Sequence, residues 1–235
     1  MTKAGIQKQG DSKGLGELWT RLRFLFIALV IYRIGTHIPV PGIDPDRLSE
    51  LFGQNQGTIV GMFNMFSGGA LERMSILALG IMPYISASII MQLMSAVIPS
   101  LEQLKKEGDS GRRTINQYTR YGTVLLATLQ AIGMSVGLAG QGLAYAVDFS
   151  FHFIAVISLV TGAVFLMWLG EQITERGIGN GISMLIFAGI VAGLPASFGN
   201  TLSMVGTGEL SVFVVVLMLA MVVLVMAFVV FMERG

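Results

Sequence analysis

Six long apolar segments, separated by short polar and charged stretches, constrain this chain more than any other feature. The hydrocarbon core of a bilayer is about 30 Å thick, so a helix needs about 20 mostly apolar residues to cross it. Charged residues make up 12% of the 235 residues, whereas soluble domains average about 25%. The chain is therefore predicted to be an all-α, multi-pass transmembrane helical bundle. The predicted spans are residues 22–41, 74–98, 118–139, 151–171, 181–204 and 210–232.

The distribution of positive charge predicts the orientation of these spans. If residues 1–21 form a cytoplasmic N-terminal segment, every one of the fifteen Lys and Arg residues except Arg33, Arg47 and Arg73 falls on the cytoplasmic side. Arg33 then lies within or at the edge of the first span. Cytoplasmic loops of membrane proteins carry an excess of Lys and Arg. We therefore expect a membrane protein whose N-terminus is cytoplasmic.

The polar residues offer little for catalysis or for metal binding. His37 and His152 have no second histidine or carboxylate at a metal-ligand spacing, and cysteine is absent. We therefore expect no metal site, no cofactor and no catalytic residue. The interiors of the last five spans also lack the ionisable residues on which intramembrane proteases and ion-coupled transporters depend. An intramembrane protease and half of a secondary transporter are alternatives that this absence disfavours.

The stretch Gly57–Gly69, GTIVGMFNMFSGG, is apolar but too short to span a bilayer. As a helix it would reach about 20 Å at 1.5 Å per residue. Irregular backbone is tolerated at membrane depth only inside protein or beside a water-filled cavity. The stretch therefore predicts a short re-entrant element on the outer side, with Gly68 and Gly69 as a permissive joint. An ordinary interfacial helix is the alternative.

Two pairs of isoleucines have the spacing of a single helix face. Ile81 and Ile85 lie in the second predicted span, and Ile182 and Ile186 lie in the fifth. Residues four apart on a helix point in the same direction. On pattern alone, such pairs indicate lipid contact or packing.

Uncharged polar residues lie within two of the spans, and one loop is strongly basic. Ser86 and Gln92 in the second span and Gln130 in the third are expected to form interhelical hydrogen bonds. The loop 104–120 is interpreted first as an anchor of topology. Its candidate contact residues are Lys105, Lys106, Arg112 and Arg113.

Two stretches carry a family resemblance. Ser75–Met94, SILALGIMPYISASIIMQLM, and Trp168–Ile186, WLGEQITERGIGNGISMLI, resemble signature segments of the SecY family, the central subunit of the bacterial protein-translocation channel. FNMFSGGA (63–70), RIGTHIPVPGID (33–44) and KKEGDSGRRTINQYTRYGT (105–123) extend the resemblance, which is of the proteobacterial kind. SecY-like chains have ten spans in two pseudo-symmetric halves. This chain resembles the first half plus the sixth span, so we expect a truncated or partial protein that does not conduct by itself.

The resemblance implies a role for each of these features. The channel would pass unfolded secretory polypeptides across the bacterial inner membrane and release apolar segments sideways into lipid. The four isoleucines would belong to a central constriction, Ser86, Gln92 and Gln130 to a lateral gate for signal sequences, and the basic loop to a contact with SecA or a ribosome. SecE, SecG and YidC would be membrane partners. Residues 57–70 would form a plug, with Thr58, Ile59, Val60, Met62, Phe63, Asn64, Met65, Phe66, Ser67, Gly68 and Gly69 as its functional residues.

Overall fold

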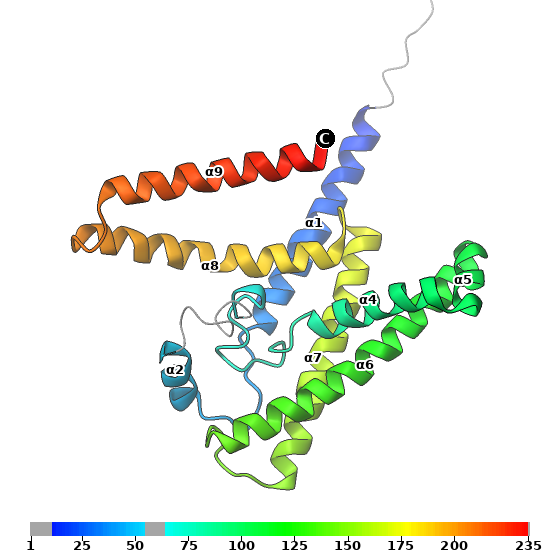
Figure 1. The fold of residues 1–235 in the computed structure, drawn as a ribbon, viewed down its shortest axis with the longest axis horizontal. Helices are drawn as coiled ribbons and strands as arrows, with labels where there is room; N and C mark the ends of the chain where they lie inside the picture. The colour runs from blue at the N-terminus through cyan, green and yellow to red at the C-terminus, as the bar shows by residue number, and fades with distance from the viewer. Residues whose placement is uncertain (1–10, 55–63, 235) are drawn as a thin grey trace, which may run out of the picture. The chain divides into compact units, whose positions relative to one another are not determined.

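The structure is a computed structural model that describes residues 11–54 and 64–234 (Figure 1). Within these ranges the regular structure is helical, with two isolated β-bridges and no β-strand. The predicted all-α class is therefore confirmed. The helices are α1 (Asp11–Gly35), α2 (Pro45–Gln54), α4 (Met82–Val97), α5 (Pro99–Lys106), α6 (Asp109–Gly140), α7 (Phe149–Arg176), α8 (Gly181–Gly206) and α9 (Val212–Arg234).

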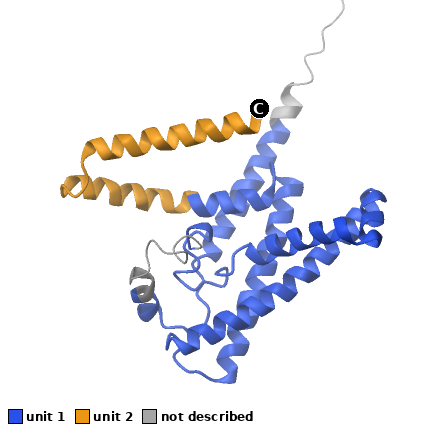
Figure 2. Cartoon of the chain, viewed as in Figure 1, with its two compact units in different colours: residues 1–190 blue, residues 191–235 orange. Residues whose placement is uncertain are grey.

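The chain divides into two compact units, Met1–Ile190 and Val191–Gly235 (Figure 2). In the first unit, α7 packs against α1, α4 and α6. Small side chains permit the close contact of α6 with α7, because Ala127, Ala131 and Ala155 are fully buried there. A second core cluster joins α1 to α7 around Leu25 and Leu166. Helix α7 is therefore the central support of this unit.

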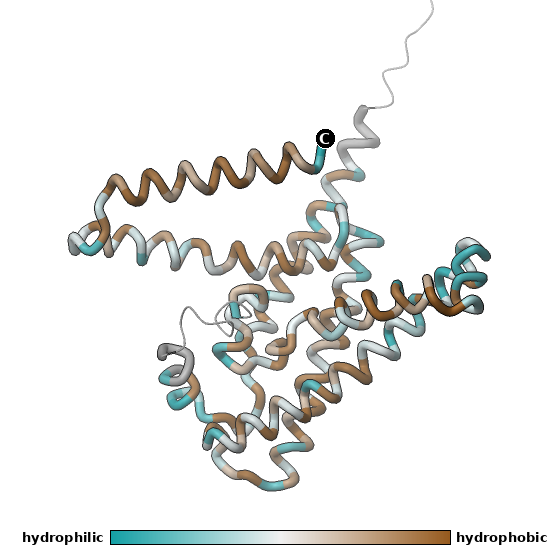
Figure 3. The backbone as a smooth tube through the Cα atoms, in the orientation of Figure 1, coloured by the Kyte–Doolittle hydropathy of each residue, from teal (hydrophilic) through white to brown (hydrophobic). Residues whose placement is uncertain are grey.

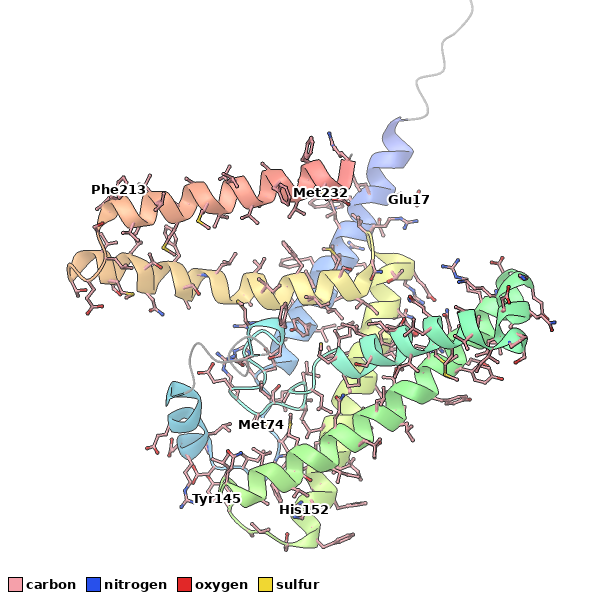
Figure 4. All side chains as sticks on the ribbon, viewed as in Figure 1. Glu17, Met74, Tyr145, His152, Phe213 and Met232 are labelled. Carbon is pink, nitrogen blue, oxygen red and sulfur yellow. The ribbon has the colours of Figure 1, made fainter. Side chains whose placement is uncertain are left out.

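A segment of turns, residues 67–81, includes the last residues of the predicted plug (57–70), leads into α4 and is drawn in cyan in Figure 1. Met74, labelled in Figure 4, lies in the middle of it. The Val40 N–H donates to the Met74 carbonyl (2.9 Å) and the Ile76 N–H donates to the Ile38 carbonyl (2.9 Å). These bonds satisfy backbone groups that no helix satisfies, and irregular backbone at membrane depth requires such partners.

Two predicted spans differ from the observed helices. The span predicted at 74–98 is helical only from Met82, because Pro83 stands in the first turn of α4, where its missing N–H costs nothing. The span predicted at 22–41 stops being helical at Gly35. Pro39 and Pro41 follow that end, and proline lacks the N–H that a continuing helix needs.

Among the described residues, four helices are long and apolar enough to cross a membrane: α6, α7, α8 and α9. Helices α4 and α5 together form a fifth candidate, which is bent by 99° at the junction before Pro99. Helix α1 is not among these candidates, and it carries Arg21, Arg23 and Arg33. The count of six spans stays a prediction.

The second unit consists of α9 and the later part of α8. No residue of α9 is buried, and the helix is apolar along nearly its whole length (Figure 3). Phe213 and Met232 mark its two ends in Figure 4 and are 75% and 65% exposed. A helix that is apolar on every side is typical of membrane spans or of helices covered by protein.

Candidate functional site

An apolar cavity of about 280 Å³ lies between the turn segment, α4 and α8. None of the described residues that line it is charged. Burial of a hydrated ion among such groups is strongly unfavourable, because nothing replaces the lost water. The lining residues are Phe66, Ser67, Leu71, Ala78, Leu79, Gly80, Ile81, Met82, Ile85 and Ile186.

Three of the four isoleucines predicted for the constriction share this cavity. Ile81 immediately precedes α4 and is 8% exposed, whereas Ile85 and Ile186 are half-buried against the second core cluster. Ile182 is not among the lining residues. It lies against α7 instead, where a Cβ added at Gly170 would come within 3.2 Å of the Ile182 Cγ1 atom. The β-branched side chains are stiff at χ1, so the three lining residues form a defined apolar wall.

The described part of the predicted plug begins at Asn64, and Thr58, Ile59, Val60, Met62 and Phe63 lie outside the described residues. The Asn64 side chain closes the segment into a loop. Its Nδ2 donates to Glu72 Oε2 (3.0 Å), and the Glu72 N–H donates to Asn64 Oδ1 (2.9 Å). Met65 and Phe66 are both exposed, and Phe66 and Ser67 line the cavity.

The predicted joint adopts the conformations that favour glycine. Gly68 and Gly69 have φ angles of 66° and 81°, a left-handed region in which any Cβ is strained. Tyr32 and Arg33 of α1 contact this joint. Neither was predicted to be a site residue. A polar phenol and a guanidinium inside an apolar run were the signal that could have identified them.

The predicted gate residues are not gathered at one place. Ser86 is half-buried, whereas Gln92 and Gln130 are exposed. Gln92 Nε2 donates to Ser88 Oγ of the same helix (3.4 Å), so this bond is not the interhelical one expected. Gln92 also lines a polar pocket of about 490 Å³ between α4, α5 and α6.

That pocket brings a predicted gate residue together with part of the basic loop. Lys105 and Arg112 line it, and so does Asp109. Lys106 instead pairs with Glu102 at 2.6 Å, one turn earlier in α5, and Arg113 is exposed on α6. The four predicted contact residues therefore divide between the pocket and the exposed surface.

One charged pair ties α6 to α7. Arg120 Nε donates to Glu171 Oε1 (2.9 Å) and Arg120 Nη2 donates to Glu171 Oε2 (2.8 Å). This two-bond geometry is the strong form of an arginine–carboxylate pair. Across residues 11–54 and 64–234, no three His, Asp or Glu side chains gather as metal ligands.

Comparison with known proteins relates this geometry to one family. The SecY family profile matches residues 75–235. The protein translocase subunit SecY of Pseudomonas aeruginosa is 66% identical over 235 residues, which are 100% of this chain and 53% of that protein. SecY of Escherichia coli K12 is 58% identical, and the match covers 98% of this chain and 53% of that protein. The chain thus spans about half the length of the curated relatives it matches.

Solved structures have the same fold. One described as a protein-conducting channel has a TM-score of 0.54 at 20% identity, over 80% of this chain and 39% of that one. Sec61 in the canine ribosome–channel complex has a TM-score of 0.55 at 20% identity, with the same coverage. The resemblance predicted from Ser75–Met94 and Trp168–Ile186 is confirmed: the chain belongs to the SecY family.

Proposed function

We propose that this chain forms about half of a channel that passes unfolded polypeptides across the bacterial plasma membrane and releases apolar segments sideways into lipid. One observation carries the proposal: Ile81 in the turn segment, Ile85 in α4 and Ile186 in α8 line one cavity, and none of its described lining residues is charged. The remaining wall would come from the half of the family fold that lies beyond this chain. The channel itself catalyses no reaction.

The chemistry of the cavity suits a seal around a moving chain. Stiff apolar side chains form a collar that makes no specific bond, so it does not select among polypeptide sequences. The same collar opposes hydrated ions, because a dry apolar constriction offers no replacement for their water. Polypeptides of many sequences can therefore slide through while the membrane remains tight to ions.

We propose that residues 57–70 are the plug of this channel, seated on its outer side. Two contacts support this role: Phe66 and Ser67 line the cavity, and the Asn64–Glu72 bonds close the segment beside it. A solved SecY structure resembles this chain with a TM-score of 0.52 at 21% identity, over 88% of this chain and 40% of that one. In that protein the plug is described as stabilising the closed state of the channel.

We also propose a cytoplasmic N-terminus. Segments assigned to the same side by the positive-charge rule contact each other in the structure. Arg47 Nη1 donates to the Gly142 carbonyl (2.8 Å), which joins two outer segments. Arg21 Nη1 donates to the Gly177 carbonyl (3.4 Å), which joins two cytoplasmic segments. SecE, SecG and YidC are the proposed membrane partners. SecA or a ribosome is the proposed cytoplasmic partner, and it would contact the polar pocket at Lys105 and Arg112.

Cysteine crosslinking in the full-length channel tests the constriction. With a polypeptide arrested during translocation, Ile81→Cys, Ile85→Cys and Ile186→Cys should each crosslink to it. Ile182→Cys should crosslink less, because Ile182 lies against α7. Leu159→Cys is the control, since Leu159 is fully buried in the core. Absence of crosslinks from all three lining positions would refute the proposed constriction.

A further inference from the structure

The joint of the plug segment is held by two hydrogen bonds from α1. The Tyr32 hydroxyl donates to the Ser67 carbonyl (3.1 Å), and Arg33 Nη1 donates to the Gly68 carbonyl (2.8 Å). Tyr32 is 5% exposed, so its bond is shielded from water. A bond from a charged donor is the stronger of the two kinds. Two adjacent residues of α1 therefore bind the adjacent carbonyls of Ser67 and Gly68.

Helix α8 is in close contact with the same joint. A Cβ added at Gly189 would lie 2.6 Å from the Phe66 carbonyl oxygen and 3.2 Å from the Gly68 nitrogen. In the reverse direction, a Cβ added at Gly68 would lie 3.1 Å from Gly189 Cα. The two backbones touch, and only glycine at position 189 leaves room for the contact.

We propose, on the basis of the plug function proposed above, that Tyr32, Arg33 and Gly189 form a latch that holds the plug in its closed position. The latch acts on the carbonyls of residues 66–68, next to the glycines about which the segment turns. Leaving the closed position requires Ser67 and Gly68 to exchange their protein donors for water. Tyr32 and Arg33 are positioning residues, since they act through the plug and touch no translocating chain.

The latch makes this exchange costly for a specific chemical reason. Ser67 and Gly68 are buried, so water has little access to their carbonyls while the plug is in place, and both bonds persist. Once a polypeptide opens a wet path, water competes for the carbonyls and the guanidinium. The latch should therefore oppose opening at rest and release once the channel is occupied.

Ion conductance of the resting full-length channel in planar bilayers tests the latch. Arg33→Gln should raise the leak by about tenfold or more, which corresponds to the loss of a charged hydrogen bond, and Tyr32→Phe by about threefold. Arg33→Lys, which keeps a cationic donor, should restore much of the seal. Gly189→Ala should also leak, because its Cβ displaces the Phe66 carbonyl.

Two controls match these variants. Arg73→Gln removes a cation from the same segment. The Arg73 side chain is exposed and lies near Gly69, where an added Cβ would be 3.5 Å from its Nη1 atom, but it makes no hydrogen bond or ion pair to the part of the chain that the structure describes. Gly193→Ala lies four residues further along α8, where an added Cβ meets nothing within 4 Å. Both should leave the leak at the level of the unaltered channel.

Deletion of residues 58–66 separates a latch from a general structural role. The deletion should leak by itself, and Arg33→Gln added to it should raise the leak no further, because the latch acts only through the plug. A further rise would overturn the latch, and so would a tight Arg33→Gln channel beside a leaking deletion. If the deletion stays tight, the plug function itself is refuted.

Discussion

Replacing Gly162 with alanine tests the close contact of α7 with the turn segment. Gly162 lies where α7 passes the backbone of Ile76, and an added Cβ would meet the Ile76 carbonyl, with its carbon only 2.7 Å away. Carbon atoms in contact normally sit about 3.5–4.0 Å apart. The helix or the turn segment must therefore move by roughly 1 Å. The turn segment has little freedom to move, because the N–H of Ile76, within it, donates to the Ile38 carbonyl.

The expected cost follows from two opposing terms. Overpacking of a core typically costs about 1–3 kcal/mol, and a clash with backbone belongs at the upper end of that range. Alanine in place of glycine returns about 1 kcal/mol of helix propensity. The net destabilisation is then about 2 kcal/mol, which in a full-length channel about twice as long as this chain corresponds to a fall of roughly 2–4 °C in melting temperature.

Thermal unfolding of the purified full-length channel in detergent measures this change. Gly133→Ala in α6 is the matched control, since an added Cβ there has nothing within 4 Å. The control should melt at or slightly above the temperature of the unaltered protein. If Gly162→Ala melts with the control, the close contact between α7 and Ile76 is not present in the protein.

Two further predictions concern the helices on either side of the polar pocket. Arg120→Gln should destabilise the channel by about 0.2–1 kcal/mol, since the pair with Glu171 is partly exposed, and the charge-swapped double variant should recover stability in the same melting assay. An unchanged melting temperature in the single variant would mean that the pair contributes nothing. Gln92→Leu and Ser86→Ala should alter how hydrophobic a signal sequence must be for export, because apolar replacements change the competition between channel and lipid. Export of a graded series of signal sequences measures this threshold, and identical thresholds would leave both residues with a packing role.

The helical membrane fold was predictable, because long apolar runs have few other solutions in a bilayer. Helix α9 is the clearest case, with 23 almost wholly apolar residues. The turn segment was not predicted, since hydropathy is the same for a buried helix and for buried turns. Gly80 and Pro83 were the local signals that α4 begins late, but they were included in a span.

The candidate site was only partly predictable for a related reason. Helical spacing suggested a common face for Ile81 and Ile85, yet Ile81 precedes α4 and faces the cavity from a turn. Ile186 lines the cavity, whereas Ile182 packs against α7. This difference depends on the position of α7, which the spacing of residues in the sequence does not predict. The bond between Tyr32 and Ser67 joins residues 35 positions apart. Contacts of this range depend on tertiary packing and leave no periodic pattern.

The hydrogen bonds between the turn segment and the loop after α1 have a mechanical consequence. These two backbone bonds, from Val40 to Met74 and from Ile76 to Ile38, stand between the glycine pair and Ile81 along the chain. A force that acts on Phe66 along the chain is therefore opposed by these two bonds before it reaches Ile81. If residues 57–70 act as the proposed plug, this anchoring would let the plug leave its place without moving Ile81, so that loss of one proposed barrier leaves the other intact.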